Sequence, residues 1–351
     1  MPTTYAIPDG RTVMAATTYT GNGGSVSISN AVNGVSFQPD FVWIKNRAAA
    51  VNHQLQNSNA GWQYGLNSNT TSAEYSDANA ITGSTSSGWS MNNNYNSHNQ
   101  SGVSYVGWNW KAGGTAVSNT AGSITSSVSA NTTAGFSVVT YSANGSTGTV
   151  GHGLGVAPSM IIVKKRNAVE RWCVFHTSTS NAYIYLNETF AAETANANLR
   201  FGNNSSVVQP TSTVFTIGSS NDVNGTSGTY VAYCFAAVAG YSAFGSFSGN
   251  GSADGPFVYT SFRPRWIMWK NSSTGATDWT IVDSSRNTYN VANSGLQPNG
   301  SYAEASNSNY QIDFLSNGFK IRTTNAEVNQ SGISIIYACF AEVPFKFANA
   351  R

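Results

Sequence analysis

Pro264-Arg-Trp-Ile-Met-Trp-Lys270 is a short apolar stretch that begins with proline and ends with lysine. The same pattern occurs twice earlier in the chain, as Pro39-Asp-Phe-Val-Trp-Ile-Lys45 and Pro158-Ser-Met-Ile-Ile-Val-Lys164. A proline at the first residue of a strand removes no donor from the hydrogen-bond ladder, so each stretch is compatible with a buried β-strand. Three copies at comparable spacing indicate a protein built from repeats.

Other features recur in the same order around these strands. An Asn-Gly turn precedes each of them, at Tyr19-Thr-Gly-Asn-Gly23, Tyr141-Ser-Ala-Asn-Gly145 and Phe247-Ser-Gly-Asn-Gly251. After each strand follow a tryptophan, a leucine, a glutamate and a closing strand: Trp62, Trp172 and Trp279; Leu66, Leu186 and Leu296; Glu74, Glu193 and Glu304; and residues 103–110, 229–235 and 333–340. The recurring tryptophans are expected to lie in the core.

These features divide the chain into an N-terminal arm at residues 1–10 and three units at residues 11–114, 133–240 and 241–351. Inside each unit, short β-branched or aromatic runs alternate with Gly, Asn and Ser turns, and no amphipathic helix of useful length is present. The sequence therefore predicts an all-β fold of three tandem antiparallel β-sandwiches. Jelly-roll and immunoglobulin-like topologies both suit units of this size, and the long loop around each glutamate favours a jelly roll.

Residues 115–132 are rich in Gly, Ser, Thr, Ala and Asn, a composition typical of a flexible linker. Their alternation at Ile124 and Val128 is also compatible with an extra edge strand on the second unit, and both interpretations stay open. The second and third units meet without a linker at residues 239–244. The sequence thus predicts a rigid pair of units with a first unit that is placed more freely.

The composition excludes several classes of function. Charged residues make up 9% of the chain and the net charge is +2, with no Lys/Arg cluster, so we expect no nucleic-acid partner. Aromatic residues make up 12%, which argues against disorder. The first residues lack an apolar run of signal-peptide length, and no stretch reaches the roughly 18 apolar residues needed to cross a bilayer. We expect folding in the cytoplasm of the producing cell and no membrane insertion.

No catalytic site is expected from the acidic residues. Glycoside hydrolysis needs two carboxylates roughly 5 to 9 Å apart across a cleft. Only one glutamate recurs per unit, at Glu74, Glu193 and Glu304, although the third unit also gathers Asp278, Asp283 and Asp313. A structural role for the recurring glutamates, fixing a loop through backbone N–H groups, is the favoured interpretation.

The histidines and cysteines indicate neither a metal site nor a cofactor. His53, His98, His152 and His176 show no ligand spacing, and the cysteines form no Cys-x-x-Cys pair. His152, between two glycines, is interpreted as a turn residue in preference to a ligand contact, and a pair with His176 in the second unit stays open. Cys234 and Cys339 occupy equivalent places in two closing strands and are interpreted as core residues. A disulfide between Cys173 and Cys234 stays open.

A glycan-binding loop is the best ligand candidate in the first unit. Non-recurring aromatic residues lie there beside amide side chains, which can donate to and accept from hydroxyl groups. The predicted ligand-binding residues are Trp89, Asn92, Asn93, Asn94, Tyr95, His98 and Asn99. An ordinary polar hairpin loop is the alternative interpretation.

Four motifs carry a resemblance to a known family: Val150-Gly-His-Gly-Leu-Gly155, Met160-Ile-Ile-Val-Lys164, Tyr230-Val-Ala-Tyr-Cys-Phe-Ala236 and Asp254-Gly-Pro-Phe-Val-Tyr259. They resemble an uncharacterised β-rich repeat family of virion and tail-fibre-like proteins of marine bacteriophages. The likeness covers the second and third units closely and the first more loosely. It implies a phage structural context and supplies no catalytic or ligand residues.

The expected function is therefore that of a non-enzymatic virion-surface protein, a tail-fibre or appendage component that adheres to host glycans. Capsid decoration, or a head fibre, is the alternative, and a secreted lectin-like protein is a further one. The expected partners are other virion proteins and further copies of the chain, with a trimer as one option. The first unit is expected to face the host because it diverges most from the other two.

Overall fold

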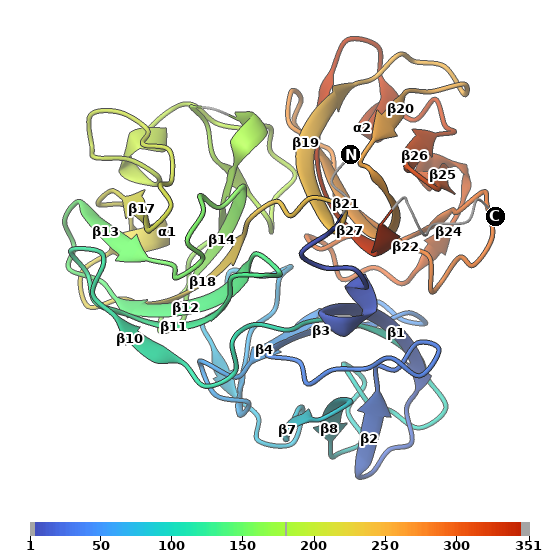
Figure 1. The fold of residues 1–351 in the computed structure, drawn as a ribbon, viewed down its shortest axis with the longest axis horizontal. Coiled ribbons are helices and arrows are strands. Elements are labelled where there is room, and N and C mark those ends of the chain that lie inside the picture. Colours follow the sequence, from blue (N-terminus) through green and yellow to red (C-terminus); the bar gives the residue numbers. More distant parts are fainter. Residues whose placement is uncertain (1–3, 180, 345–351) are drawn as a thin grey trace.

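The computed structural model describes residues 4–179 and 181–344. Residues 1–3 of the expected N-terminal arm, residue 180 and residues 345–351 of the third unit lie outside the described residues. The described chain is all-β and contains several antiparallel sheets, as predicted. Figure 1 shows three lobes around a common centre, coloured blue, green to yellow, and orange to red. We call residues 11–114 lobe 1, residues 115–240 lobe 2 and residues 241–344 lobe 3.

Each lobe contains a main antiparallel sheet in which four strands follow the same order. The first strand pairs with the closing strand, which pairs with the Pro-led strand, which pairs with the strand after it. In lobe 1 these are β1 (Met14–Thr20), β9 (Ser104–Trp110), β3 (Phe41–Asn46) and β4 (Gln54–Asn57). In lobe 2 they are β12 (Phe136–Ser142), β18 (Thr229–Phe235), β14 (Met160–Lys165) and β15 (Cys173–His176), and in lobe 3 β19 (Ser242–Ser248), β27 (Ser334–Pro344), β21 (Phe262–Asn271) and β22 (Trp279–Asp283).

Each lobe also has a smaller sheet. Lobe 1 has β2 (Val26–Ser29), β8 (Gly88–Met91) and β7 (Gly83–Thr85); lobe 2 has β13 (Gly148–Gly151) and β17 (Val214–Ile217); lobe 3 has β20 (Phe257–Tyr259), β26 (Gly318–Ile321) and β25 (Ile312–Leu315). Two further sheets have two short strands each. They pair β5 (Tyr64–Gly65) with β6 (Tyr75–Ser76), and β23 (Ser294–Gly295) with β24 (Ala305–Ser306). The helical segments are short: α1 (Asn221–Asn224), α2 (Ala326–Asn329), and 3-10 turns at Gly10–Thr12, Thr177–Thr179, Ala197–Leu199 and Ser308–Tyr310.

Residues 115–132 form edge strands instead of a free linker. In this segment β10 (Val117–Asn119) pairs with β11 (Ser126–Asn131), and β11 pairs with β12. With β16 (Ile184–Tyr185) at the other edge, the main sheet of lobe 2 reaches seven strands. Of the two interpretations that the sequence leaves open, the structure therefore has the edge strand.

The main sheets are covered on both faces, which explains why the Pro-led strands are apolar at consecutive residues. In β3, Phe41 and Trp43 face a core at the centre of the molecule, whereas Val42 and Ile44 face a core inside lobe 1. Residues of β14 alternate in the same way between the central core and the core of lobe 2. The main sheets of lobes 1 and 2 thus each lie between the core of their own lobe and the shared centre, whereas the core of lobe 3 is continuous with that centre.

The central core joins all three lobes through aromatic side chains. Trp110 of lobe 1 packs against Trp266 of lobe 3 at a ring-centroid distance of 5.6 Å, and Phe41 stacks on Tyr233 of lobe 2 at 4.2 Å. The cavity at this centre measures about 20 Å³, which leaves room for about one water molecule. Lobe 1 is therefore packed against both other lobes, and the expectation of a more freely placed first unit is wrong.

The recurring lysine, one residue before the end of each Pro-led strand, is buried. Lys45 Nζ donates to Asn46 O at 2.7 Å, and Lys164 Nζ donates to Lys165 O at 2.7 Å. Lys270 Nζ donates to Thr277 O at 2.6 Å. Burial lowers the pKa of each lysine to about 8. The recurring lysine therefore serves to bind backbone carbonyls inside the protein and is not a surface charge.

The cysteines are three free, buried thiols. Cys234 and Cys339 lie opposite Ile161 and Ile267, and Asn109 lies opposite Val42, so the predicted equivalence of these positions is confirmed. Cys173 lies on β15 and Cys234 on β18, with β14 between the two strands. This separation explains why the two thiols of lobe 2 do not form a disulfide.

Candidate functional site

The main aromatic residue of the predicted glycan-binding loop in lobe 1 lies in the core. Trp89 is fully buried on β8, where its ring packs edge-on against Tyr19 at a centroid distance of 5.9 Å. An indole with no exposed face cannot stack on a sugar. Trp89 is therefore a core residue, and its prediction as a ligand residue is corrected.

His98 and Asn99 are also buried, and each recurs structurally in the other lobes. The Asn99 side chain accepts from Asn22 N at 3.0 Å, and the side chains of Asn224 and Asn329 accept in the same way from the backbone of Asn144 and Asn250. His98 precedes Asn99 as Val223 and Val328 precede their asparagines, and all three are buried. These residues hold the Asn-Gly turn of each lobe, so the prediction that they bind a ligand is corrected as well.

The other predicted residues lie in a surface loop between β8 and β9, two strands that belong to different sheets. Asn92 Oδ1 accepts from Ser25 Oγ at 3.1 Å and from Asn93 N at 3.0 Å, and Asn94 Oδ1 accepts from Ser101 N at 3.0 Å. Tyr95 is 53% exposed and is the one aromatic side chain of the predicted set that presents a face to solvent. A ligand role for Asn92, Asn93, Asn94 and Tyr95 therefore stays a prediction.

The recurring tryptophan belongs to the joints between lobes. Trp172 Nε1 of lobe 2 donates to Asn67 O of lobe 1 at 3.0 Å, and Trp279 Nε1 of lobe 3 donates to Tyr185 O of lobe 2 at 2.8 Å. In lobe 1 the same place, just before β4, is taken by His53, whose Nε2 contacts Gln297 O of lobe 3 at 2.9 Å. Trp62 is only partly buried, so its inclusion among the recurring core residues is wrong.

An arginine–glutamate pair strengthens two of the three joints. Arg166 of lobe 2 binds Glu74 of lobe 1 at 2.7 Å, and Arg47 of lobe 1 binds Glu304 of lobe 3 at 2.7 Å. In both joints the backbone N–H of the glutamate also donates to the backbone carbonyl of its arginine.

The joint between lobes 2 and 3 has neither the arginine nor the glutamate of this pair. There the backbone N–H of Ala192 donates to Ser272 O at 3.0 Å, so alanine stands where the other lobes have glutamate and serine where they have arginine. Glu193 is displaced by one residue and accepts from Tyr183 in its own lobe. Each lobe therefore binds the next in the same manner, and the three joints close a ring.

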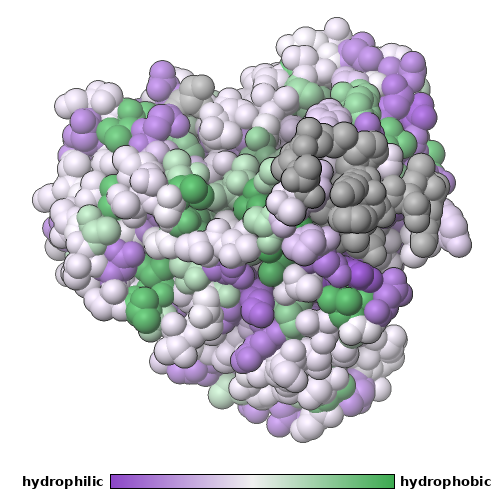
Figure 2. Space-filling model, in the orientation of Figure 1, coloured by the Kyte–Doolittle hydropathy of each residue, from purple (hydrophilic) through white to green (hydrophobic). Residues whose placement is uncertain are grey.

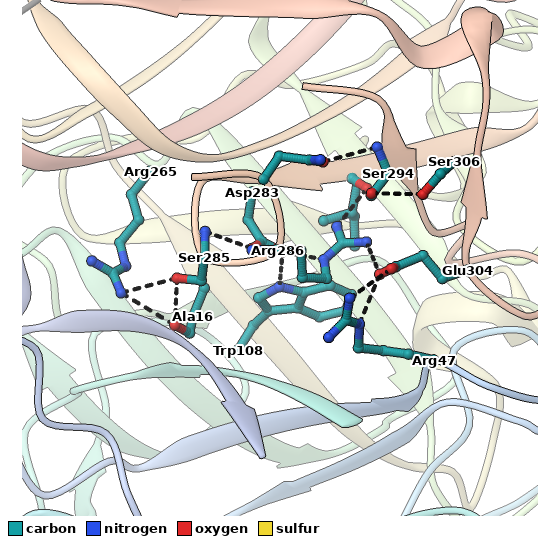
Figure 3. A network of polar contacts seen from close by, with 12 residues as sticks. Ala16, Arg47, Trp108, Arg265, Asp283, Ser285, Arg286, Ser294, Glu304 and Ser306 are labelled. Carbon is teal, nitrogen blue, oxygen red and sulfur yellow. Dashed lines mark hydrogen bonds and ion pairs between the residues drawn. The ribbon is translucent and has the colours of Figure 1, made fainter. Parts of the chain in front are cut away.

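A buried ionic network reinforces the joint between lobes 1 and 3 (Figure 3). Asp283 accepts from Arg286 Nε at 2.6 Å and from Trp108 Nε1 of lobe 1 at 3.0 Å. Arg286 also donates to Glu304 at 2.8 Å. Burial alone raises the pKa of Asp283, but the Arg286 guanidinium and the Trp108 N–H outweigh it and leave that pKa below its ordinary value. Asp283 and Glu304 are therefore ionised structural residues.

Two further acid pairs occupy equivalent places beside the buried lysines of lobes 2 and 3. Asp222 of α1 lies by Glu170, and Glu327 of α2 lies by Asp278. Burial and the neighbouring carboxylate raise the pKa of Glu170 and of Glu327. Asp222 is bound by Arg200 at 2.9 Å, an arrangement typical of a structural ion pair.

The hydrogen bonds of His53, His152 and His176 require neutral imidazole rings. His176 Nδ1 accepts from Ser178 N at 3.1 Å while Nε2 donates to Tyr337 O at 3.1 Å. His53 Nδ1 accepts from Trp43 Nε1 at 2.8 Å, and His152 Nδ1 accepts from Leu154 N at 3.2 Å. Protonation at Nδ1 would place two donors against each other, and burial lowers the pKa of His176 to about 4.

We predict that these histidines make the protein acid-labile. A group whose unfolded pKa is near 6.5 and whose folded pKa is near 4 binds more protons when unfolded, so stability is lost as pH falls from about 6.5 to about 4. His176 alone should contribute on the order of 3 kcal/mol to this loss. Urea unfolding at pH 7 and pH 5 should show a weaker dependence for His176→Asn, since Asn57 lies at the end of β4 as His176 lies at the end of β15. An unchanged dependence would contradict this assignment.

Exposed aromatic side chains gather on lobe 3, a feature that sequence reasoning missed. Large apolar residues of the described chain that remain exposed include Phe257 at 45%, Tyr259 at 55%, Tyr289 at 77% and Tyr302 at 59%. Figure 2 shows that most of the visible face is pale and weakly polar, in keeping with the low charge of the sequence. Among the described residues, no group of three or more His, Cys, Asp and Glu side chains is placed so that it could hold a metal ion.

The comparisons with known proteins give a family without a known function. Residues 10–344 match a family described as a domain of unknown function (DUF7483), so a single domain of that family spans all three lobes. No curated protein matches the chain. Within the described residues, no helix has both the length and the apolar character needed to span a membrane.

Proposed function

The chain belongs to the DUF7483 family, and we propose that it is a non-enzymatic structural protein of a bacteriophage virion surface. In this proposal it is a tail-fibre or appendage component that adheres to host-surface glycans. It folds in the host cytoplasm and joins other virion proteins, and copies of the chain associate, with a trimer as one arrangement. The phage setting rests on the resemblance of the four sequence motifs.

The closed ring of lobes is the observation that carries the proposal. Three joints bind successive lobes by the same backbone and ring N–H contacts, and one apolar core fills the centre. A particle component that must keep its shape outside the cell benefits from such a block. It is held mainly by apolar packing and hydrogen bonds, which salt does not weaken as it weakens exposed ion pairs.

The state of the acidic residues supports a non-enzymatic role. Of the recurring glutamates, Glu74 and Glu304 bind arginines and Glu193 binds Tyr183. The third unit has the most acidic residues of the three. Two of them are also bound by arginines: Asp283 by Arg286 at 2.6 Å, and Asp313 by Arg322 at 2.6 Å. Carboxylates held in this way are poorly suited to serve as a proton donor or a nucleophile.

We also propose that the lobes are three copies of one jelly-roll-like sandwich unit. The support is the common strand order of the main sheets together with a second, smaller sheet in every lobe. The pairs Asn22–Asn99, Asn144–Asn224 and Asn250–Asn329 hold equivalent turns. Superposition of the lobes tests this, and unrelated strand paths outside the main sheets would contradict it.

Mass spectrometry of purified particles, with immunogold labelling by antibodies against the chain, tests the setting. Labelling on the tail is expected. Labelling distributed over the head would favour the alternative of capsid decoration or a head fibre. Recovery of the chain only from the medium, free of particles, would contradict the virion proposal and favour a secreted lectin-like protein.

We predict that the purified protein releases no reducing ends from capsular or cell-wall polysaccharide, because its carboxylates are engaged in structural contacts. The assay measures reducing ends over time. Product formation that Glu327→Gln or Glu304→Gln abolishes, with folding retained, would overturn the non-enzymatic proposal. Glu327 is included because its raised pKa gives it the best remaining character for a general acid.

A further inference from the structure

The smaller sheet of lobe 3 presents an aromatic face to solvent. In β20, Phe257 is 45% exposed, Val258 is 7% exposed and Tyr259 is 55% exposed. Alternate residues of a strand point to opposite sides of the sheet, so Phe257 and Tyr259 lie on the outer face and Val258 points inward. The two rings are separated by about 7 Å along the strand.

The register carries this outer face across the sheet. Tyr259 lies opposite Gly318, which lies opposite Leu315 on β25. Residues that are directly opposite in antiparallel strands share one face, so Tyr259 and Leu315 flank a position without a side chain. A Cβ atom at Gly318 would lie 2.0 Å from Val258 O, so the backbone itself requires glycine there.

The exposed apolar residues continue past the edge of β25. Asn290 Nδ2 donates to Phe314 O at 3.1 Å and Asn290 Oδ1 accepts from Phe314 N at 2.9 Å, which fixes this segment along the strand. Its neighbours Tyr289 and Val291 are 77% and 44% exposed. The aromatic face therefore extends from β20 to residues 289–291.

The charges on this face neutralise one another. Lys320 lies between Phe257 and Asp313 in the register and binds Asp254 at 2.9 Å. Arg322 binds Asp313 at 2.6 Å. No excess of either sign is left in these pairs to attract a charged ligand, so the face suits an uncharged one.

The sister lobes show that the fold does not require these aromatic residues. In lobe 1, Gly88 lies opposite Ser29 and Thr85, as Gly318 lies opposite Tyr259 and Leu315. Ser27 and Ser90 form the neighbouring row, where lobe 3 has Phe257 and Lys320. In lobe 2 the corresponding outward pair is Thr149 and Thr216. Hydroxyl side chains thus occupy the outer face of the small sheet in lobes 1 and 2. The fold therefore does not explain the aromatic rings at this place in lobe 3.

We propose that the face formed by Phe257, Tyr259, Leu315 and residues 289–291 binds an uncharged polysaccharide. Aromatic rings pack against the apolar faces of sugar rings, and neighbouring amide and hydroxyl groups bind the sugar hydroxyls. A folded protein partner is a weaker candidate. Aromatic residues offer at most about 250 Å² each, so three partly exposed rings provide less than the roughly 800 Å² that a stable protein interface buries per partner. This inference deepens the proposed adhesion and rests on it, and it places the glycan contact on lobe 3 in place of lobe 1.

The test compares three forms of the full chain on a printed array of neutral glucans, mannans and bacterial surface polysaccharides. Phe257→Ser/Tyr259→Ser installs the residues that lobe 1 has at these positions, so its unfolding midpoint should stay unchanged. Tyr95→Ser is the matched control, because Tyr95 is 53% exposed and belongs to the loop of lobe 1 that the sequence predicts to bind glycans. Wild type and the control should bind neutral glycans, and the double variant should bind at least about tenfold more weakly. Binding should persist at about 0.5 M salt.

Three other outcomes would contradict parts of this proposal. Full binding by the double variant, or loss in Tyr95→Ser alone, would overturn the lobe 3 site while leaving adhesion in place. Binding that needs charged glycans and disappears at high salt would overturn the uncharged ligand. No binding by wild type to any glycan would overturn both this site and the adhesive part of the proposed function, whereas virion localisation is tested separately by particle composition.

Discussion

Asp283→Asn should destabilise the protein by about 3 to 5 kcal/mol, because it removes one partner of a fully buried ion pair. Arg286 has no exposed side-chain surface, and it would keep its charge with only Glu304 to balance it. The Trp108 indole of lobe 1 would also face a neutral amide in place of a carboxylate. Equilibrium unfolding in urea measures the change in the free energy of unfolding.

The matched control is Asp254→Asn on the same lobe. Asp254 also binds a basic residue, Lys320 at 2.9 Å, but its side chain is 80% exposed. Solvent screens such a pair, so we expect no measurable change in the unfolding midpoint. Equal effects of the two variants would show that the Asp283 network does not hold the joint between lobes 1 and 3.

Trp110→Ala should destabilise the protein by about 3 to 5 kcal/mol, the usual result of removing a large aromatic side chain from a packed core. Trp110 is 1% exposed and contacts Phe41, Phe136, Trp266 and Phe340, which come from all three lobes. The change should therefore lower the unfolding temperature of the whole chain, as measured by circular dichroism and by tryptophan fluorescence.

Trp62→Ala is the control for this prediction. It removes the same side chain from the same lobe, but Trp62 is only partly buried and lies away from the centre, so a smaller loss is expected. If Trp110→Ala melted lobe 1 at a lower temperature and left the other two lobes unchanged, the shared core would be refuted.

The sequence predicted the β-class and the recurring strands because those depend on local patterns. A proline before an apolar run and an Asn-Gly turn are readable from a few residues. The equivalence of Cys234, Cys339 and Asn109 was also predictable, since it follows from counting along the closing strands. These features need no knowledge of how the lobes sit together.

The ring was not predictable, because its contacts join residues far apart in the sequence. Arg47 binds Glu304, which lies 257 positions away in the sequence. No sequence feature near either residue identifies its partner. One signal was present: the glutamate of each unit recurs, and the residue after the Pro-led strand is arginine in two units and serine in the third. The joint position in lobe 1 was misassigned because His53 takes the place of a tryptophan.

The ligand role predicted for the buried residues Trp89, His98 and Asn99 was wrong for a related reason. Trp89 follows Gly88 in a short strand, and its inward direction is set by pairing with Ile28, which sequence alone does not reveal. The better signal was Phe257-Val-Tyr259, where two aromatic residues two positions apart must share a face. Which face that is, buried or exposed, depends on the position of the small sheet, so the sequence could suggest the pair without assigning it.

Differential scanning calorimetry of the full chain tests the central claim, that three lobes form one closed block, most directly. A shared core and three joints predict a single endotherm, with a calorimetric enthalpy equal to the van't Hoff enthalpy. Trp110→Ala should move that one endotherm to lower temperature without splitting it. Two or three separate endotherms in the wild-type protein, or a lobe 1 transition that moves alone, would contradict the account.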